Sequence, residues 1–557
     1  MNTLIKWFRG ITISLFAILA LTLTWSFVSP NNRYFEIVKN LELFANVFKE
    51  VNEYYVDDIN PSQLLDKGVK KMLGNLDPYT VYISEDKIED FRTLNTGQYA
   101  GIGASTVLFN GHTYVSMVYK DFSAYKQGLR IGDEIIKVDG VNIAGLSQEK
   151  LNQLVKGQAK SKVSLTVNRP GTSDPVELRF EREKISIPNV PYSGMLNNEV
   201  GYIKFTEFTP NGYKNVKKAL QELMKEGAQG IVLDLRHNLG GLLKEAVDIS
   251  NLFLPPNLEV VHTKGKVKSS KFTYSTTYNP LAPDVPLIVL VDNMSASASE
   301  IVAGTLQDYD RAVLIGQKTY GKGLVQNVRN LPYHSQVKLT IAKYYIPSGR
   351  CIQAVDYAHR HADGSVGKIP DSLKVAFSTK NGRTVFDGGG IDPEVILKRD
   401  YASELARQLV AKGYIFNYAS EYALHHNQIP EAKTFNLSDE EFSAFVKWLE
   451  KEPFKYVNPL EKNLKELKEA SDKYKGNESV KNNIQKIEKK LNQPLVTVLS
   501  ANKKEIKRLL EANIASRYYL EPGLIEAGLG DDPYVAKAIE VLDNKAFYQK
   551  LLTPNKP

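Results

Sequence analysis

The chain has 557 residues, of which 43% are hydrophobic and 24% charged, and a formal net charge of +8. This length is enough for three or four domains with sizeable cores. Because no stretch concentrates the positive charge, the composition argues against nucleic acid as a partner, and the single cysteine, Cys351, excludes an internal disulfide.

Residues 1–32 are predicted to form a membrane anchor. Lys6 and Arg9 precede residues 11–28, which carry no charge and as a helix would span about 27 Å, close to the hydrocarbon thickness of a bilayer. The basic flank predicts that the N-terminus stays inside and that the body is exported. In a bacterium the protein would then sit in the inner membrane with its body in the periplasm. A cleaved signal peptide, which would release the body, is the alternative.

Residues 33–95 are predicted to be helical. Apolar residues recur at helical spacing at Ile37, Leu41, Phe44 and Phe48. The segment also contains the sequence Leu-Asp-Pro-Tyr-Thr at residues 76–80.

Residues 96–184 are similar to a PDZ domain. Gly101, Ile102 and Gly103 precede a strand-like stretch, and a predicted helix at 147–155 and an alternating strand at 162–168 follow. In such a domain an exposed sheet edge adds a substrate strand, and backbone N–H groups near Ile102 and Gly103 capture a terminal carboxylate. We therefore expect protein substrates with free, apolar C-termini as partners. A PDZ domain that only packs against the rest of the protein, or gates it, is the alternative.

A glycine pair follows the first of two strands predicted to be buried on both faces. Residues 229–235 form an apolar run, and Gly240 and Gly241 come shortly after it. Glycines at such a point let backbone N–H groups line a pocket, as an oxyanion hole requires. An ordinary strand-to-helix turn is the alternative.

Three serines follow the second buried strand, at residues 286–291. Ser295, Ser297 and Ser299 lie at the start of a predicted helix, where unpaired N–H groups favour developing negative charge. The N–H of Ala298 is a natural second donor beside Gly240 or Gly241. One of the serines can equally be a simple helix cap.

Lys322 lies between Gly321 and Gly323, after another short apolar run. A free lysine has a pKa near 10.4 and is protonated at neutral pH, but desolvation lowers that pKa. The alternatives are a solvated loop lysine or a phosphate ligand. The pattern Gly-x-x-x-x-Gly-Lys-Ser/Thr is absent, because Gly323 follows the lysine and lacks a hydroxyl.

Together, in this order, these motifs resemble the carboxyl-terminal processing peptidases, or tail-specific proteases, over roughly residues 46–395. The resemblance implies an α/β protease core of the ClpP/crotonase type at residues 185–400, with the PDZ domain inserted and residues 33–95 packed on that core. It also implies that Ser297 is the nucleophile, Lys322 the general base and Gln326 a polar group that orients the lysine. Asp308 matches an acidic position implicated in some members, although a surface or capping role is the alternative.

The resemblance predicts a serine endopeptidase that cleaves exported proteins near or from their C-termini, through an acyl-enzyme and without metal or cofactor. Of the eight histidines, only His237 lies inside a site-like motif, and the family commonly places other residues there. The other histidines lack the spacing and acidic company of a zinc site. A non-catalytic PDZ scaffold or chaperone on a degenerate protease fold is the alternative, and intact Ser297, Lys322 and Gln326 argue against it.

Residues 401–557 are predicted to form a helical domain outside this resemblance. Residues 462–490 are charged and helix-prone, and Leu460, Leu464 and Leu467 lie on one stripe. We expect this domain to bind a regulatory partner or a second copy of the chain.

Overall fold

The computed structural model describes residues 32–361, 363–398, 402–473, 478–491 and 493–554. The predicted membrane segment, residues 11–28, lies outside these ranges. Within them, no helix combines the length and the apolar character that a membrane crossing requires. The chain divides into two compact units, at residues 1–75 and 76–557.

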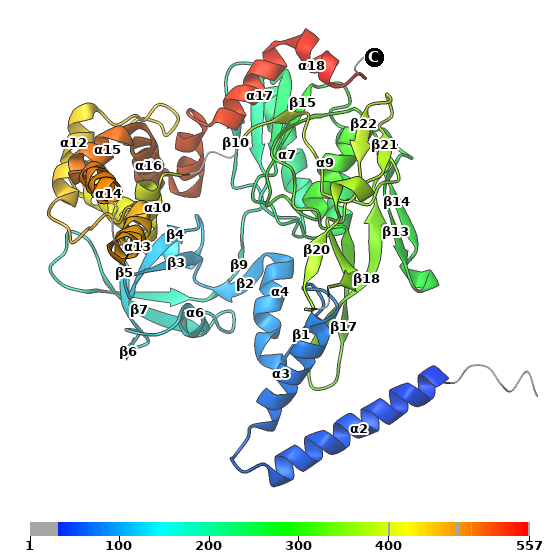
Figure 1. Ribbon diagram of the computed structural model, residues 1–557. Helices are drawn as coiled ribbons and strands as arrows, with labels where there is room; N and C mark the ends of the chain where they lie inside the picture. Colours follow the sequence, from blue (N-terminus) through cyan, green and yellow to red (C-terminus); the bar gives the residue numbers. More distant parts are fainter. Residues whose placement is uncertain (1–31, 362, 399–401, 474–477, 492, 555–557) are drawn as a thin grey trace, which may run out of the picture. The chain divides into compact units, whose positions relative to one another are not determined.

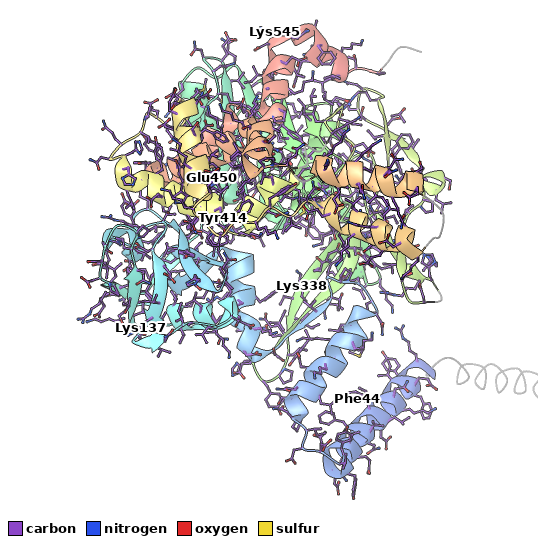
Figure 2. The ribbon with its side chains drawn as sticks, turned by 60° about the vertical axis from the view of Figure 1, so that its left-hand side comes forward. Phe44, Lys137, Lys338, Tyr414, Glu450 and Lys545 are labelled. Carbon is purple, nitrogen blue, oxygen red and sulfur yellow. The ribbon has the colours of Figure 1, made fainter. Side chains whose placement is uncertain are left out.

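The described part of the first unit consists of two helices, α2 (Asn32–Tyr54) and α3 (Pro61–Gly74). α3 begins at a proline, and the Asn60 side chain caps it by accepting the Gln63 N–H. Large apolar side chains of α2 are exposed, including Phe44, which Figure 2 labels. The helical prediction is confirmed for both helices.

Residues 76–95 belong to the second unit and are not helical throughout. β1 (Val81–Ile83) pairs antiparallel with β18 (Gln336–Tyr345), so the expectation of a wholly helical segment is wrong for these residues. A strand is favoured there because a sheet edge was available to complete its backbone hydrogen bonds, which the local pattern does not reveal. The helices η1 (Glu85–Lys87) and α4 (Ile88–Thr96) follow.

A six-stranded sheet forms the centre of the second unit, in the order β10-β11-β12-β15-β16-β23. Every neighbouring pair is parallel except β10 with β11. All residues of β12 and β15 are buried, as the apolar runs predict for strands covered on both faces. The strands are β10 (Tyr192–Met195), β11 (Val200–Lys204), β12 (Gly230–Asp234), β15 (Leu287–Val291), β16 (Val313–Gly316) and β23 (Val395–Ile396).

Helices cover both faces of this sheet, and they come from distant parts of the chain. One hydrophobic cluster joins the sheet to α7 (Gly212–Lys225), α8 (Leu243–Ser250) and α9 (Ala298–Asp308). A second cluster joins the opposite face to α17 (Pro533–Asp543) and α18 (Lys545–Leu551). Figure 1 shows these last helices in red beside β10 and β15. The C-terminal segment therefore completes the layers around the central sheet.

A second sheet has the order β1-β18-β13-β14, with β17 paired to β18. Its remaining strands are β13 (Glu259–Gly265), β14 (Phe272–Ser275) and β17 (Leu324–Asn330). Two short hairpins and two 3₁₀ turns complete this part: β19 (Val355–Arg360) with β20 (Val366–Lys368), β21 (Ala376–Ser378) with β22 (Thr384–Phe386), η2 (Lys268–Ser270) and η3 (Asp371–Leu373).

The PDZ-like segment forms its own sheet in the order β3-β4-β5-β7-β8, with β6 paired to β5 and with its own hydrophobic cluster. β3 is an edge strand, and the pair of β2 and β9 joins this sheet to the rest of the unit. Its elements are β2 (Gln98–Gly101), β3 (Ala104–Phe109), β4 (His112–Val118), α5 (Ser123–Lys126), β5 (Glu134–Val138), β6 (Val141–Asn142), α6 (Gln148–Val155), β7 (Lys162–Asn168), β8 (Val176–Glu181) and β9 (Glu183–Ser186).

The C-terminal segment is helical, as predicted. Figure 2 labels Tyr414 and Glu450 among its helices, and a cluster rich in aromatic side chains forms its core. The helices are α10 (Glu404–Ala411), α11 (Tyr414–His425), α12 (Asp439–Leu449), α13 (Pro459–Lys473), α14 (Glu478–Leu491), α15 (Leu495–Ala501) and α16 (Lys503–Leu529).

A buried ion pair joins the end of α9 to the turn after β18. Arg350 Nη2 donates to Asp308 Oδ1 at 2.8 Å and to Gln307 Oε1 at 2.7 Å, and the two charged side chains are 2% and 1% exposed. Asp308 also accepts the Ser348 N–H at 3.0 Å. The alternative of a surface or capping role for Asp308 is therefore wrong, because the chain folds the β18 turn over the end of α9.

Replacing Asp308 by alanine should lower the free energy of unfolding by about 3–5 kcal/mol, because it leaves the Arg350 charge buried without a partner. The urea dependence of circular dichroism measures this loss. Lys318→Met is the control: it breaks a pair with Asp392 whose side chains are 41% and 50% exposed, and such exposed pairs contribute about 1 kcal/mol or less. Equal losses for the two variants would contradict the prediction.

Candidate active site

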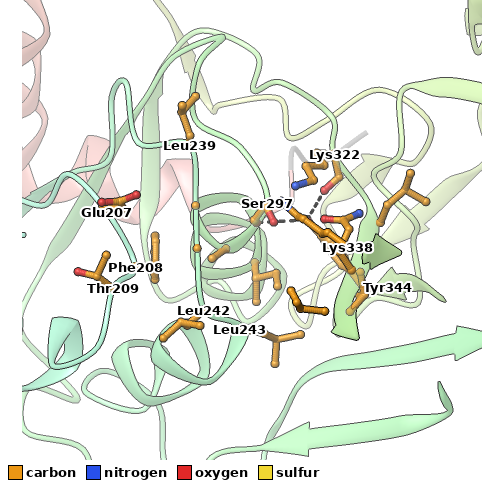
Figure 3. A pocket seen from close by; sticks show the side chains of 18 residues that line it. Glu207, Phe208, Thr209, Leu239, Leu242, Leu243, Ser297, Lys322, Lys338 and Tyr344 are labelled. Carbon is orange, nitrogen blue, oxygen red and sulfur yellow. Dashed lines mark hydrogen bonds between the residues drawn. The ribbon is translucent and has the colours of Figure 1, made fainter. Parts of the chain in front are cut away.

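A cavity of about 380 Å³ is lined by candidate residues of the α/β core (Figure 3). It lies where β12 and β15 end, so segments far apart in the sequence meet at one edge of the sheet. The six candidates that line it are Ser297, Lys322, Gln326, Gly240, Gly241 and Ala298.

Ser297 is the N-cap of α9 and has a strained backbone. Its φ of 57° and ψ of −114° lie in a region that residues other than glycine rarely adopt. The two neighbouring serines are fully buried and committed to the fold: Ser295 Oγ donates to Leu235 O, and Ser299 Oγ donates to Asn238 O, both at 2.8 Å. Of the three serines, only Ser297 lines the cavity.

The glycine pair lies directly against this turn. A Cβ on Gly240 would be 2.6 Å from Ala296 O and 2.8 Å from Ala298 N, so no other residue fits there. The Gly240 N–H already donates to Asn238 Oδ1 at 2.9 Å. By contrast, the N–H groups of Gly241 and Ala298 have no acceptor within the described part of the chain. These two N–H groups are therefore available to bind an oxyanion.

Glu300 connects the serine segment to the lysine segment, and its role was missed in the sequence. Its Oε2 accepts the N–H groups of Ser297 at 2.8 Å and Lys322 at 2.9 Å. Its Oε1 accepts the Gly321 N–H at 2.7 Å and the Thr319 hydroxyl at 2.6 Å. Burial raises the pKa of Glu300 to about 7, against the opposing effect of these hydrogen bonds. The signal available in the sequence was its position three residues after an N-cap serine, which is the capping-box spacing.

Lys322 lies at one side of the cavity and has a lowered pKa. Burial, and after it the charge of Lys338, lower the pKa of Lys322 to about 8. Its ammonium lies 4.5 Å from the centre of the Tyr79 ring, and no hydrogen bond joins its Nζ to Ser297 Oγ. The Tyr344 hydroxyl holds the two backbones together through one shared proton, with its oxygen 2.7 Å from the carbonyl oxygen of Lys322 and 3.2 Å from that of Ser297 (Figure 3).

Gln326 lines the cavity but is bonded to a different group than expected. Its Nε2 donates to Thr340 Oγ1 at 3.2 Å, and that hydroxyl donates to Asp77 Oδ1 at 3.2 Å. Asp77 also accepts the N–H groups of Tyr79 and Thr80, both at 2.8 Å. Residues 76–80 therefore support the cavity wall, a role that the sequence motif alone did not indicate.

The remaining candidates of the core lie away from this cavity. Neither Asp308 nor His237 lines it. The His237 side chain is 74% exposed, and its Nδ1 lies 3.1 Å from Asp292 Oδ2. A Ser–His mechanism through His237 therefore has no support in this geometry.

Asp234 and Arg236 brace the end of β12 instead of lining the cavity. Arg236 Nη2 donates to Asp234 Oδ2 at 2.6 Å, and its Nη1 lies 2.8 Å from Asp532 Oδ2 at the start of α17. Although burial alone would raise the pKa of Asp234, Arg236 and Lys204 hold it below its ordinary range. This ionised pair fixes both the glycine turn and the returning C-terminal helix.

In the PDZ segment, a groove of about 280 Å³ runs between edge strand β3 and helix α6, and Ile102 lines it. The carbonyl oxygens of Ile102 and Gly103 accept the N–H groups of Ala124 at 2.7 Å and Tyr119 at 2.9 Å. The N–H groups of Ile102 and Gly103 donate to no acceptor within the residues that the structure describes. Gly101 ends β2 and pairs with Glu183.

Comparison with known proteins agrees with this architecture. The profile of Peptidase family S41 matches residues 199–358, and a PDZ domain profile matches residues 93–168. The Carboxy-terminal-processing protease of Bartonella bacilliformis is 33% identical over 332 residues, which are 59% of this chain and 76% of that protein. The chain belongs to the carboxy-terminal processing proteases of peptidase family S41. It is therefore a serine protease with a PDZ domain.

Two further relatives match this chain over different shares of their own lengths. The Carboxyl-terminal-processing protease of Synechocystis sp. is 36% identical over 288 residues, which are 50% of this chain and 66% of that protein. A solved structure, the photosystem II D1 C-terminal processing protease, is 26% identical and covers 68% of this chain and 97% of its own, with a TM-score of 0.36. Because that TM-score is low, the family assignment rests on the sequence matches.

The C-terminal helices also have known relatives, which corrects the expectation that they lie outside the family. A profile described as "Probable PDZ-protease, C-terminal helical domain" matches residues 405–542. The helical domain is thus a recurrent companion of PDZ proteases. The residues of this domain carry no catalytic motif, so the sequence offered no signal that links them to the family.

Replacing Glu300 by glutamine should lower kcat/KM by about 100-fold, since displacing catalytic groups by about 1 Å has an effect of this size. The amide NH₂ would face two N–H donors, so the turns that carry Ser297 and Lys322 would separate. Thr319→Val, which removes one of the four hydrogen bonds, should have a much smaller effect. Steady-state hydrolysis of one peptide measures both variants, and full activity of Glu300→Gln would contradict the assignment.

Proposed function

We propose that this protease cleaves peptide bonds through an acyl-enzyme on Ser297, with Lys322 as general base. The proposal rests on one cavity that holds a hydroxyl on a strained turn, a half-buried lysine with a pKa of about 8, and two N–H groups that have no acceptor among the described residues. A lysine of this kind is partly neutral near pH 7 and can accept the proton of a serine hydroxyl.

The geometry supports the following steps. Ser297 Oγ attacks the scissile carbonyl carbon while its proton passes to Lys322 Nζ, and the Gly241 and Ala298 N–H groups stabilise the oxyanion. The Lys322 ammonium then gives the proton to the departing amine, and the C-terminal fragment leaves. Water then loses a proton to Lys322 and attacks the ester, and Lys322 gives that proton to Ser297 Oγ as the acid leaves. Because catalytic hydrogen bonds often form fully only with substrate bound, we expect the amine to move from the Tyr79 ring towards Ser297.

Ser297→Ala and Lys322→Ala should each abolish hydrolysis, and the double variant should lose no more than either alone, because nucleophile and base act as a unit. For the wild type, kcat/KM should rise with pH through about 8, since the base must be neutral and burial lowers the pKa of Lys322 to that value. A peptide assay between pH 6 and 10 measures both effects. Labelling of a serine other than Ser297 by a fluorophosphonate would overturn the assignment, as would activity lost in EDTA and restored by zinc.

We also propose that the PDZ domain reads the free C-terminus of the substrate. An edge strand beside a groove supports strand addition. The N–H groups of Ile102 and Gly103 have no acceptor in the described residues, which suits a terminal carboxylate. Ile102, Leu151 and Val155 line the groove, which favours an apolar last residue.

The proposed substrates are exported proteins, cleaved near or from their C-termini. This proposal is supported by the basic flank at Lys6 and Arg9 and the uncharged residues 11–28, which favour a body outside the cytoplasm. A non-catalytic scaffold is disfavoured because the residues for the reaction converge on one cavity.

Amidation of the substrate C-terminus should lower kcat/KM about ten- to a hundredfold, because charge-assisted hydrogen bonds to the carboxylate contribute about 1.5–3 kcal/mol. The comparison uses one tailed substrate with a carboxylate or an amide end. A short peptide too small to reach the PDZ groove is the control and should be cleaved equally well in both forms. Equal rates for the two tailed substrates would leave the domain a packing or gating role.

A further inference from the structure

A second lysine lines the active-site cavity, and the proposed mechanism gives it no task. Lys338 lies near the start of β18 and is labelled in Figures 2 and 3. Its cross-strand neighbours are Val81 on β1 and Val328 on β17. Both sides of the strand therefore present apolar residues to it, and neither offers a carboxylate.

The direction of its side chain follows from the pleat of β18. Residues at every second position share one face of a strand. Lys338 and Tyr344 both line the cavity, and Thr340 between them binds Gln326. The intervening residue Lys343 is exposed and absent from the cavity wall. The ammonium of Lys338 is thus delivered to the catalytic side of the sheet, whereas that of Lys343 is not.

Within the described residues, Lys338 forms no ion pair, and its ammonium donates no hydrogen bond. Burial lowers its pKa below the ordinary value of lysine. Glu207, the one acid among the described residues that line the cavity, lies on the opposite side of Ser297 in Figure 3, and burial raises the pKa of that carboxyl group. The positive charge of Lys338 is therefore not cancelled by a neighbour before it acts on Lys322.

We propose that Lys338 is a positioning residue that acts on the reaction through Lys322: its positive charge favours the neutral form of the general base. This inference rests on the proposed role of Lys322. It gives a defined task to a half-buried charge that has no neutralising partner among the described residues, an arrangement that is otherwise costly.

The groups around Lys322 show why such a charge is needed. The carboxylates of Glu300 and Asp77 both favour the protonated form of Lys322. The Tyr79 ring, 4.5 Å away, also favours the cation. Burial opposes them, and Lys338 supplies the next largest opposing effect. Without Lys338, two acids and an aromatic ring would surround the base, and it would hold its proton to a higher pH.

The decisive measurement is the pH dependence of kcat/KM for Lys338→Met in the full-length protein. The probe is a peptide with blocked ends and no acidic residue, so that a direct ion pair between Lys338 and substrate cannot contribute. We expect the acid limb to move up by roughly one pH unit, which lowers kcat/KM about tenfold below the limb. Above both limbs, kcat/KM should equal that of the wild type.

Three further variants separate this role from a structural one. Lys338→Gln should reproduce the shift, and Lys338→Arg, which keeps the charge, should leave the limb within a few tenths of a unit of the wild type. Lys343→Met is the matched control on the other face of β18 and should leave the profile unchanged. A loss that is equal at every pH, or a limb that does not move in either neutral variant, would overturn the proposal for Lys338.

Failure of the underlying mechanism gives a different result. If Lys322→Ala retained activity with an unaltered pH profile, Lys322 would not be the base, and the proposed function itself would fail. If Lys322→Ala is inactive while Lys338→Met keeps the wild-type limb, only the inference about Lys338 fails.

Discussion

The active site depends on one buried carboxylate. Glu300 accepts four hydrogen bonds. Two come from the backbone N–H groups of the lysine segment, at Gly321 and Lys322, one from the Ser297 N–H and one from the Thr319 hydroxyl. Because the side chain is fully buried, an unpaired donor left in its place would be costly. Ser297 and Lys322 therefore cannot separate without breaking this set of bonds. A single acid at the start of α9 thus holds the Ser297 turn and the Lys322 loop together.

The central sheet brings these two segments together. Parallel strands present their carboxyl ends along one edge, so the turns after β12 and β15 meet. The His237 N–H, after β12, donates to the carboxylate of Asp292, after β15, at 3.0 Å, although the two residues are 55 positions apart in the sequence. The close approach also explains the glycines: a Cβ on Gly240 would collide with the backbone of the serine turn. The strain at Ser297 is maintained because the surrounding bonds determine its position.

The last two helices of the described chain pack on the central sheet. α17 and α18 return from the helical domain to cover the face of the sheet opposite α9, and Arg236 links that return to the strand that carries the glycine turn by reaching Asp532. Removing the last helices would therefore expose the apolar face of β12 and β15 and release one partner of the Arg236 pair. The C-terminal helices and the central sheet therefore depend on the same apolar contacts and on the same ion pair.

Local sequence pattern was enough to predict the buried strands and several candidate site residues. Continuous apolar runs indicated the buried strands, and small or charged residues just beyond them indicated Ser297, Lys322 and the glycine pair. The charged residues that surround Ser297 and Lys322, by contrast, follow from the tertiary fold. Glu300 meets Lys322 across 22 residues and Asp77 meets Thr340 across 263, and Lys338 enters the cavity because of its register against β1 and β17. Periodicity cannot reveal such contacts, because which face of a strand turns inward, and what lies opposite it, is set by pairing with distant segments.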